Sequence, residues 1–212
     1  MSPGIDHLAV AATSLDGRAL DDFLGVTLPA GGRHARMGTH NRLLRLGPSE
    51  YLELIAIDPD GVTPERPRWF ELDDPAMQKR LAAGPRLVHW VARVDTTELP
   101  VLPVDVGPWE PFQRGDLSWQ LTVRSDGTLP GAGVVPSLIC WSGSAHPAAR
   151  LPDLGVRLEA LELEHPRADD VQRQLDALGL GQRCGAGAVP RIIAHLRTPG
   201  GPRILRSDEP VG

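Results

Sequence analysis

IDHLAV (residues 5–10) and LVHWVA (residues 87–92) have the same form, a short apolar strand with a histidine at its third position. The second stretch begins 82 residues after the first (87 minus 5). Repetition of one strand pattern over such a distance indicates a repeated supersecondary unit. The two stretches therefore predict a fold built from related modules, each of which begins at one of these strands.

The first module is expected to end at about residue 58. Thr13 and Ser14 follow the first strand and are candidates to cap a helix. Gly31 and Gly32 are expected to form a turn after that helix. The elements predicted for this module are a strand at 5–12, an amphipathic helix at about 20–25, and strands at 41–46 and 51–57.

A linker at 59–85, with a helix at 74–82, precedes a second module at about 86–143. Its later strands are predicted at 117–123 and 134–141. The helix of this module is its least regular part, because Pro100 and Pro103 would interrupt a long helix.

A shorter third unit is predicted at about 155–208, with the order strand, helix and terminal hairpin. One unit cannot bury both its helix and its sheet alone, so we expect the units to pack as one domain over 1–212. The predicted fold class is α+β, with two full βαβββ modules and a partial third βαββ unit.

The composition limits the function classes. An apolar content of 41% is enough for a hydrophobic core, and a net charge of −5 with dispersed basic residues gives no reason to expect nucleic acid as a partner. No window is long enough to span a bilayer and residues 1–8 lack a signal-peptide pattern, so we expect no membrane partner and a cytoplasmic location. Cys140 and Cys184 are far apart and are interpreted as free thiols.

Three ionisable residues fall inside apolar strands. Period-two geometry puts His7, Glu53 and His89 on the strand face opposite their most apolar neighbours. Burial of such groups is costly unless a partner satisfies them, and a divalent metal (Zn, Ni, Fe or Mn) would accept imidazole and carboxylate ligands. Each residue could instead be hydrogen-bonded to a neighbour or reach solvent, and that alternative stays open.

These segments resemble the vicinal-oxygen-chelate (glyoxalase-like) superfamily. IDHLAV, YLELIA (51–56) and LVHWVA look like its first, fourth and restart strands. GGRH (31–34), GTHNRLL (38–44) and SAHPAA (144–149) are similar to the stand-alone glyoxalase-like domain proteins of bacteria. The resemblance implies paired modules that curve into a cup, with His7, Glu53 and His89 at three of four metal-ligand positions.

The fourth position departs from the family pattern, because Ser137 stands where the metalloenzymes have a carboxylate. Three protein ligands with an open site are still adequate for a metal that also binds substrate. His146, from the loop that follows, is the alternative fourth group. His40 and Arg42 lie on a strand beside the expected cup and are candidates to bind an anionic or carbonyl-bearing ligand, although charged strand residues commonly face water.

Trp119 could line the cup or the core. The residues expected to contact substrate are His40, Arg42, Trp119, Ser137 and His146.

The leading hypothesis is a metal-dependent enzyme of lyase or isomerase type, acting on a small oxygenated substrate whose enediolate is stabilised by the metal. Glu53 could instead be the base that moves a proton. The main alternative is a metal-free binding or sequestration protein of the bleomycin-resistance type. A third is an interaction module whose cup is closed by a partner or by a second copy in a homodimer.

Overall fold

The computed structural model of the protein describes residues 3–212 and contains two β-sheets. In chain order its elements are β1 (Gly4–Ala11), α1 (Ala19–Leu24), β2 (Ala30–His34), β3 (Thr39–Arg45), β4 (Tyr51–Ile57), η1 (Trp69–Glu71), α2 (Pro75–Leu81), β5 (Arg86–Arg93), β6 (Trp109–Arg114), β7 (Leu117–Thr122), η2 (Pro130–Gly133), β8 (Ser137–Trp141), α3 (Pro147–Arg150), β9 (Arg157–His165), α4 (Ala168–Ala177), β10 (Cys184–Ala186), β11 (Arg191–Thr198) and β12 (Gly201–Arg206).

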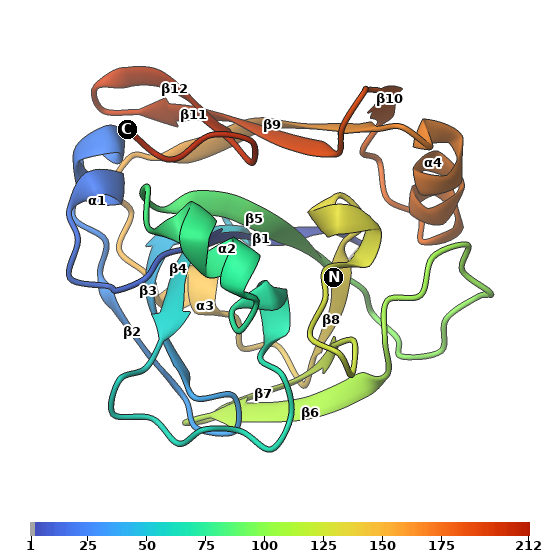
Figure 1. Ribbon diagram of the computed structural model, residues 1–212, viewed down its shortest axis with the longest axis horizontal. Coiled ribbons are helices and arrows are strands. Elements are labelled where there is room, and N and C mark those ends of the chain that lie inside the picture. Colours follow the sequence, from blue (N-terminus) through green and yellow to red (C-terminus); the bar gives the residue numbers. More distant parts are fainter. Residues whose placement is uncertain (1–2) are drawn as a thin grey trace.

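The larger sheet has eight strands in the order β2-β3-β4-β1-β5-β8-β7-β6. Its two halves are equivalent: β1 is parallel to β4, β5 is parallel to β8, and the antiparallel pair β1 and β5 joins them. The sheet curls until its edge strands β2 and β6 approach one another, so that it encloses a concave face, the cup (Figure 1). The predicted α+β fold of repeated modules around a cup is thus confirmed.

The second half differs from the prediction of a complete βαβββ module, because residues 94–108, between β5 and β6, form no helix. Pro100 and Pro103 in this segment remove two amide donors that a helix would need. Helix α4 of the third unit packs there instead: the amide of Val104 donates to Gln174 Oε1 (3.0 Å), and Gln174 Nε2 donates to the Val104 carbonyl (3.3 Å). The third unit thus supplies a helix to the segment in which the second module has none.

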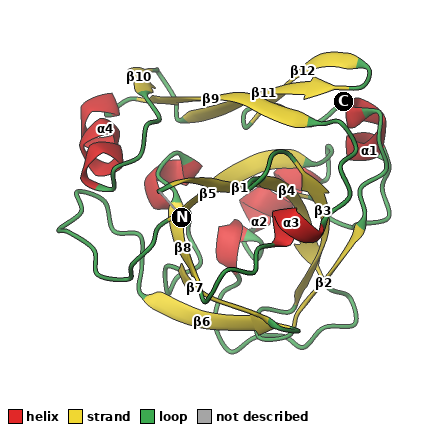
Figure 2. Ribbon diagram, turned by 180° about the vertical axis from the view of Figure 1, so that it is seen from behind, coloured by secondary structure: helices red, strands yellow, loops and turns green. Residues whose placement is uncertain are grey.

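The third unit forms a four-stranded sheet in the order β10-β9-β11-β12, which lies as a separate layer over the large sheet (Figures 1 and 2). Strand β10 is an addition to the predicted strands. One apolar cluster joins the two layers and includes Leu8 and Val10 of β1, Leu163 of β9 and Ile192 of β11. The second layer therefore covers the convex face, and the cup lies on the opposite face.

Two local predictions were wrong. Gly31 and Gly32 lie within strand β2 and not in a turn. Helix α1 begins at Ala19 with no side-chain cap, and Ser14 donates instead to the nearby carboxylate of Asp16 (2.9 Å). Strand β6 was not predicted, because Pro111 interrupts its strand pattern. Helix α3 was not predicted either, because it spans only Pro147–Arg150.

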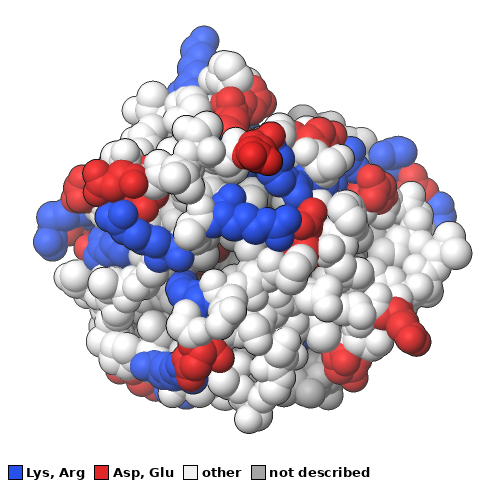
Figure 3. All heavy atoms as spheres, turned by 90° about the horizontal axis from the view of Figure 1, so that it is seen from below, with Lys and Arg blue, Asp and Glu red and all other residues white. Residues whose placement is uncertain are grey.

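On the face seen from below in Figure 3, acidic and basic side chains are interspersed among residues of other types. No helix within residues 3–212 is long and apolar enough to cross a bilayer.

Candidate functional site

A pocket of about 390 Å³ opens in the cup. Its polar lining comes mainly from the first half of the sheet, with one residue from β6. Five aromatic side chains form most of the remaining wall. The polar residues are His7, His34, Asn41, Glu53 and Arg114, and the aromatic ones are Tyr51, Trp69, Phe70, Trp119 and Trp141.

A β-bulge orients the first of these residues. Ile5 pairs with Ala92 and His7 pairs with Val91, so Asp6 is an extra residue in β1. The Asp6 carboxylate accepts a hydrogen bond from His7 Nδ1 at 2.8 Å. The bulge therefore breaks the alternation of the strand and lets two successive side chains interact on the cup side.

Asp6 is fully buried among polar side chains. Its Oδ2 accepts hydrogen bonds from Trp141 Nε1 (2.9 Å) and His146 Nε2 (3.0 Å), and Arg93 lies 3.7 Å away. Burial by itself raises the pKa of Asp6, but the hydrogen bonds from His146 and His7 hold it well below its usual range. Asp6 is therefore an anion that fixes the orientation of the His7 ring.

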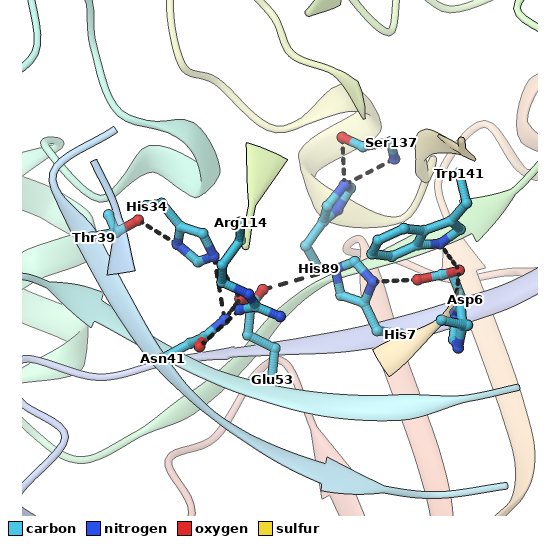
Figure 4. Close-up of polar contacts among 11 residues, drawn as sticks. Asp6, His7, His34, Thr39, Asn41, Glu53, His89, Arg114, Ser137 and Trp141 are labelled. Carbon is cyan, nitrogen blue, oxygen red and sulfur yellow. Dashed lines mark hydrogen bonds and ion pairs between the residues drawn. The ribbon is translucent and has the colours of Figure 1, made fainter. Parts of the chain in front are cut away.

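His7 and Glu53 meet in the pocket. Because His7 Nδ1 is held by Asp6, Nε2 is directed toward Glu53 Oε2, at a distance of 3.7 Å (Figure 4). The imidazole stacks on Tyr51 with ring centroids 4.6 Å apart. Burial and the nearby carboxylates of Asp6 and Glu53 raise the pKa of Tyr51 well above its usual value, so its hydroxyl stays protonated.

The other oxygen of Glu53 is held by Asn41. Asn41 Nδ2 donates to Glu53 Oε1 (2.5 Å) and approaches His34 Nε2 (3.3 Å), while Asn41 Oδ1 accepts the amide of Gly32 (2.8 Å). Burial lowers the pKa of His34 to about 4, although Glu53 acts in the opposite direction. A neutral His34 that donates from Nδ1 to Thr39 Oγ1 (3.0 Å) satisfies every one of these contacts.

His89 has a different environment. Its Nδ1 donates to the Gly133 carbonyl (3.0 Å), and its Nε2 accepts from the amide of Ser137 (3.0 Å) and lies 3.0 Å from Ser137 Oγ. Burial lowers its pKa to about 3, against the effect of the Gly133 hydrogen bond. In Figure 4 the ring points toward Ser137 and away from Glu53. His89 is a neutral side chain whose two nitrogens are both used within the fold.

The predicted donor set His7, Glu53 and His89 therefore does not fit a metal ion in this arrangement. A ligand nitrogen must offer a lone pair, and that of His89 Nε2 is occupied by the Ser137 amide. Within residues 3–212, no three His, Cys, Asp or Glu side chains lie close enough to hold a metal together. Metal binding by His7 and Glu53 stays a prediction.

Sequence comparison identifies the family. The family model of the glyoxalase-like domain matches residues 5–179, most of the chain. The chain belongs to the glyoxalase-like domain family. This membership puts it in the vicinal-oxygen-chelate superfamily, as the resemblance implied.

Among solved structures, the glyoxalase-like domain is similar to one described as a hypothetical protein from Staphylococcus aureus. The TM-score is 0.56 at 15% identity, over 90% of this chain and 88% of that one. No curated protein sequence matches. The structural likeness therefore supports the fold of the glyoxalase-like domain and carries no activity with it.

The other residues that were predicted to contact the substrate fall into two groups, according to whether they lie at the pocket or on the opposite face of the sheet. Trp119 lines the pocket. His146 does not line it, but its Nε2 donates to Asp6, and its Nδ1 accepts a hydrogen bond from the amide of Ala148 (3.2 Å). Ser137 does not line this pocket; it lines a smaller adjoining cavity that shares Trp69 and Phe70 with it, and its hydroxyl lies 3.0 Å from His89 Nε2.

His40 and Arg42 alternate with Asn41 on β3, and so they project from the opposite face of the strand. Arg42 pairs there with Asp21 of α1 (2.8 Å) and donates to the Leu28 carbonyl. Their predicted contact with a ligand in the cup is not supported by these positions.

Sequence reasoning missed four polar residues of the site, Asp6, His34, Asn41 and Arg114, and four of the five aromatic residues that line the pocket. Asp6 was hidden because the bulge breaks the period of two on which the facing of β1 was predicted. Asn41 was accessible to reasoning, since it alternates with Arg42 on a strand that was predicted. Arg114 lies on β6, a strand that was not predicted.

Proposed function

We propose that this glyoxalase-like domain catalyses proton transfer on a small oxygenated substrate bound in the cup. The observation that best supports this proposal is the arrangement of Asp6, His7 and Glu53. The buried carboxylate of Asp6 orients the His7 imidazole toward the Glu53 carboxylate inside the pocket. An acid and a base at hydrogen-bonding distance from one substrate are what enolisation of a carbonyl compound needs.

In the proposed step, Glu53 removes a proton from the carbon next to a carbonyl group. The electron pair of that C–H bond becomes a C=C bond, and the carbonyl oxygen takes a proton from His7 Nε2. Asp6 balances the charge that the imidazole carries before the transfer, because its carboxylate lies 2.8 Å from Nδ1. In an exchange, Glu53 returns a proton to the same carbon and the enol oxygen returns its proton to His7. In an isomerisation of an α-hydroxy carbonyl compound, Glu53 delivers its proton to the former carbonyl carbon, and the hydroxyl on the neighbouring carbon loses its proton to His7 and becomes the new carbonyl group.

Removal of the base is the direct test. The probes are hydroxyacetone, dihydroxyacetone and pyruvate in D₂O, with loss of the carbon-bound proton signal followed by ¹H NMR. At least one probe should exchange faster with the parent protein, and Glu53→Gln should slow this by about 10²- to 10⁴-fold, which is the usual contribution of a positioned base. Glu159→Gln is the matched control, since Glu159 is exposed on β9. Equal exchange in parent and Glu53→Gln, or none above buffer in the parent, contradicts the proposal.

A metal-free binding or sequestration protein is the second candidate. It is favoured by the aromatic wall, because five aromatic side chains suit enclosure of a flat ligand without chemistry. A ligand that binds with equal affinity to parent and Glu53→Gln, and that leaves the protein unchanged, would support this candidate over the enzyme.

A further inference from the structure

Arg114 brings a positive charge into the pocket without a carboxylate partner. It is the last residue of β6, and its Nη1 donates to Asn41 Oδ1 at 3.3 Å (Figure 4). Two arginines nearby, Arg36 and Arg66, both pair with Glu110, whereas Arg114 forms no ion pair within residues 3–212. Its guanidinium is therefore available to an anion that enters the cup.

Two glycines make room for this arrangement. A Cβ atom at Gly32 would lie 2.6 Å from Arg114 Cδ, and one at Gly31 would lie 2.1 Å from Asn41 Oδ1. Real Cβ atoms do not approach other heavy atoms so closely, so a side chain at either position would displace its neighbour. The bare backbone of β2 thus lets Arg114 cross from the second half of the sheet to the polar side of the pocket.

The charge of Glu53 is already met within the pocket. Asn41 donates to Oε1 and His7 Nε2 faces Oε2, whereas Asn41 offers Arg114 only a neutral amide oxygen. A guanidinium presents parallel N–H donors that match a carboxylate in two hydrogen bonds. The surrounding wall of Trp69, Phe70, Trp119 and others is suited to a flat molecule.

We infer that Arg114 binds the carboxylate of a small planar acid, which is the substrate class of this pocket. This inference rests on the proposed function, because it names the molecule on which Glu53 and His7 would act. In this arrangement Arg114 holds the acid group, the aromatic wall covers the flat body, and Glu53 and His7 face the reacting carbon and oxygen.

The test compares benzoate with its neutral analogue benzamide by isothermal titration calorimetry. Benzoate should bind the parent more tightly than benzamide does. Arg114→Gln should weaken benzoate binding by about tenfold or more, the usual effect of losing a charged hydrogen-bond partner, and leave benzamide unchanged. Gly32→Ala should act in the same direction while it keeps the charge. Gly17→Ala is its control, because a Cβ there meets nothing within 4 Å.

Three results would overturn the inference: no benzoate binding to the parent, equal binding of benzoate and benzamide, or full benzoate affinity in Arg114→Gln. Should Gly32→Ala not fold, as circular dichroism would reveal, Arg114→Gln decides alone. The exchange assay separates this failure from failure of the proposed function. Loss of the carboxylate preference with exchange retained rejects only the substrate class, and carboxylate binding without exchange rejects only the chemistry.

Discussion

The two halves of the cup begin with the same strand pattern and use its histidine in different ways. In the first half, a bulge supplies Asp6 to one nitrogen of His7 and leaves the other nitrogen directed at Glu53. In the second half, Gly133 and Ser137 bind both nitrogens of His89. Of two residues at matching points of a repeat, one thus lines the pocket and the other is held within the fold.

The contrast teaches that the two halves contribute different kinds of side chain to the site. The second half contributes aromatic side chains and Arg114, whereas the proposed acid and base, His7 and Glu53, both come from the first half. Equivalent positions in repeated modules are free to diverge once one copy carries the chemistry, because the other then needs only to stabilise the fold.

Among the variants that test this contrast, Asp6→Ala is expected to lower the free energy of unfolding most. It leaves His7, His146 and Arg93 without their shared carboxylate, and removal of one partner from a buried charged network costs about 3–5 kcal/mol. Urea unfolding gives the free energy, with the exposed Asp16→Ala as control. A loss below about 1 kcal/mol would show that Asp6 is not the centre of the first half.

The pH dependence of stability tests the structural role of His89. Its pKa is about 3 when folded and near 6.5 when unfolded, so between these values the unfolded chain binds the extra proton. Stability is therefore unaffected well above about pH 6.5 and falls as the pH drops below it, by about 3 kcal/mol at pH 4.5 for this residue. His34, with a pKa of about 4, acts in the same direction.

His89→Gln should remove the His89 part of this slope, although the variant itself is less stable at pH 7. The measurement is urea unfolding at intervals between pH 7 and 4.5, with His195→Gln, a partly exposed residue, as control. An unchanged slope in His89→Gln would contradict the buried neutral state of this histidine.

Ser137→Ala should have a smaller effect, about 1 kcal/mol, which is typical of one lost hydroxyl hydrogen bond. The backbone amide of residue 137 still donates to His89, so the ring keeps its orientation. Ligand affinity should stay at the parent value, since Ser137 does not line the pocket. A marked change in binding without a change in stability would assign Ser137 to the site.

The smallest expected effect concerns metal content. The parent protein and His89→Gln, both purified without chelator, should contain the same amount of zinc, nickel, iron or manganese. Neither nitrogen of His89 is free to bind a metal in the parent. Elemental analysis of parent and variant makes the comparison, with His7→Gln alongside. Loss of metal in His89→Gln would restore the three-ligand site predicted from the sequence.

Sequence patterns predicted most strands of the large sheet and the facing of His7 and Glu53, because both depend on local alternation. The environment of His89 depends on Gly133 and Ser137, 44 and 48 residues further along the chain, and local alternation carries no information about such contacts. Asp6 was missed for a related reason: a bulge is defined by pairing with another strand.

The helix that covers residues 94–108 comes from the third unit, and this sets an order of assembly. The first half carries its own helix, α1, but Leu8 and Val10 on its convex face belong to one apolar cluster with Leu163 and Ile192 of the third unit. The second half must wait until α4 leaves the ribosome, because domains gain their packing from segments already made. During translation both halves of the cup therefore lack part of their apolar cover until the third unit has been made.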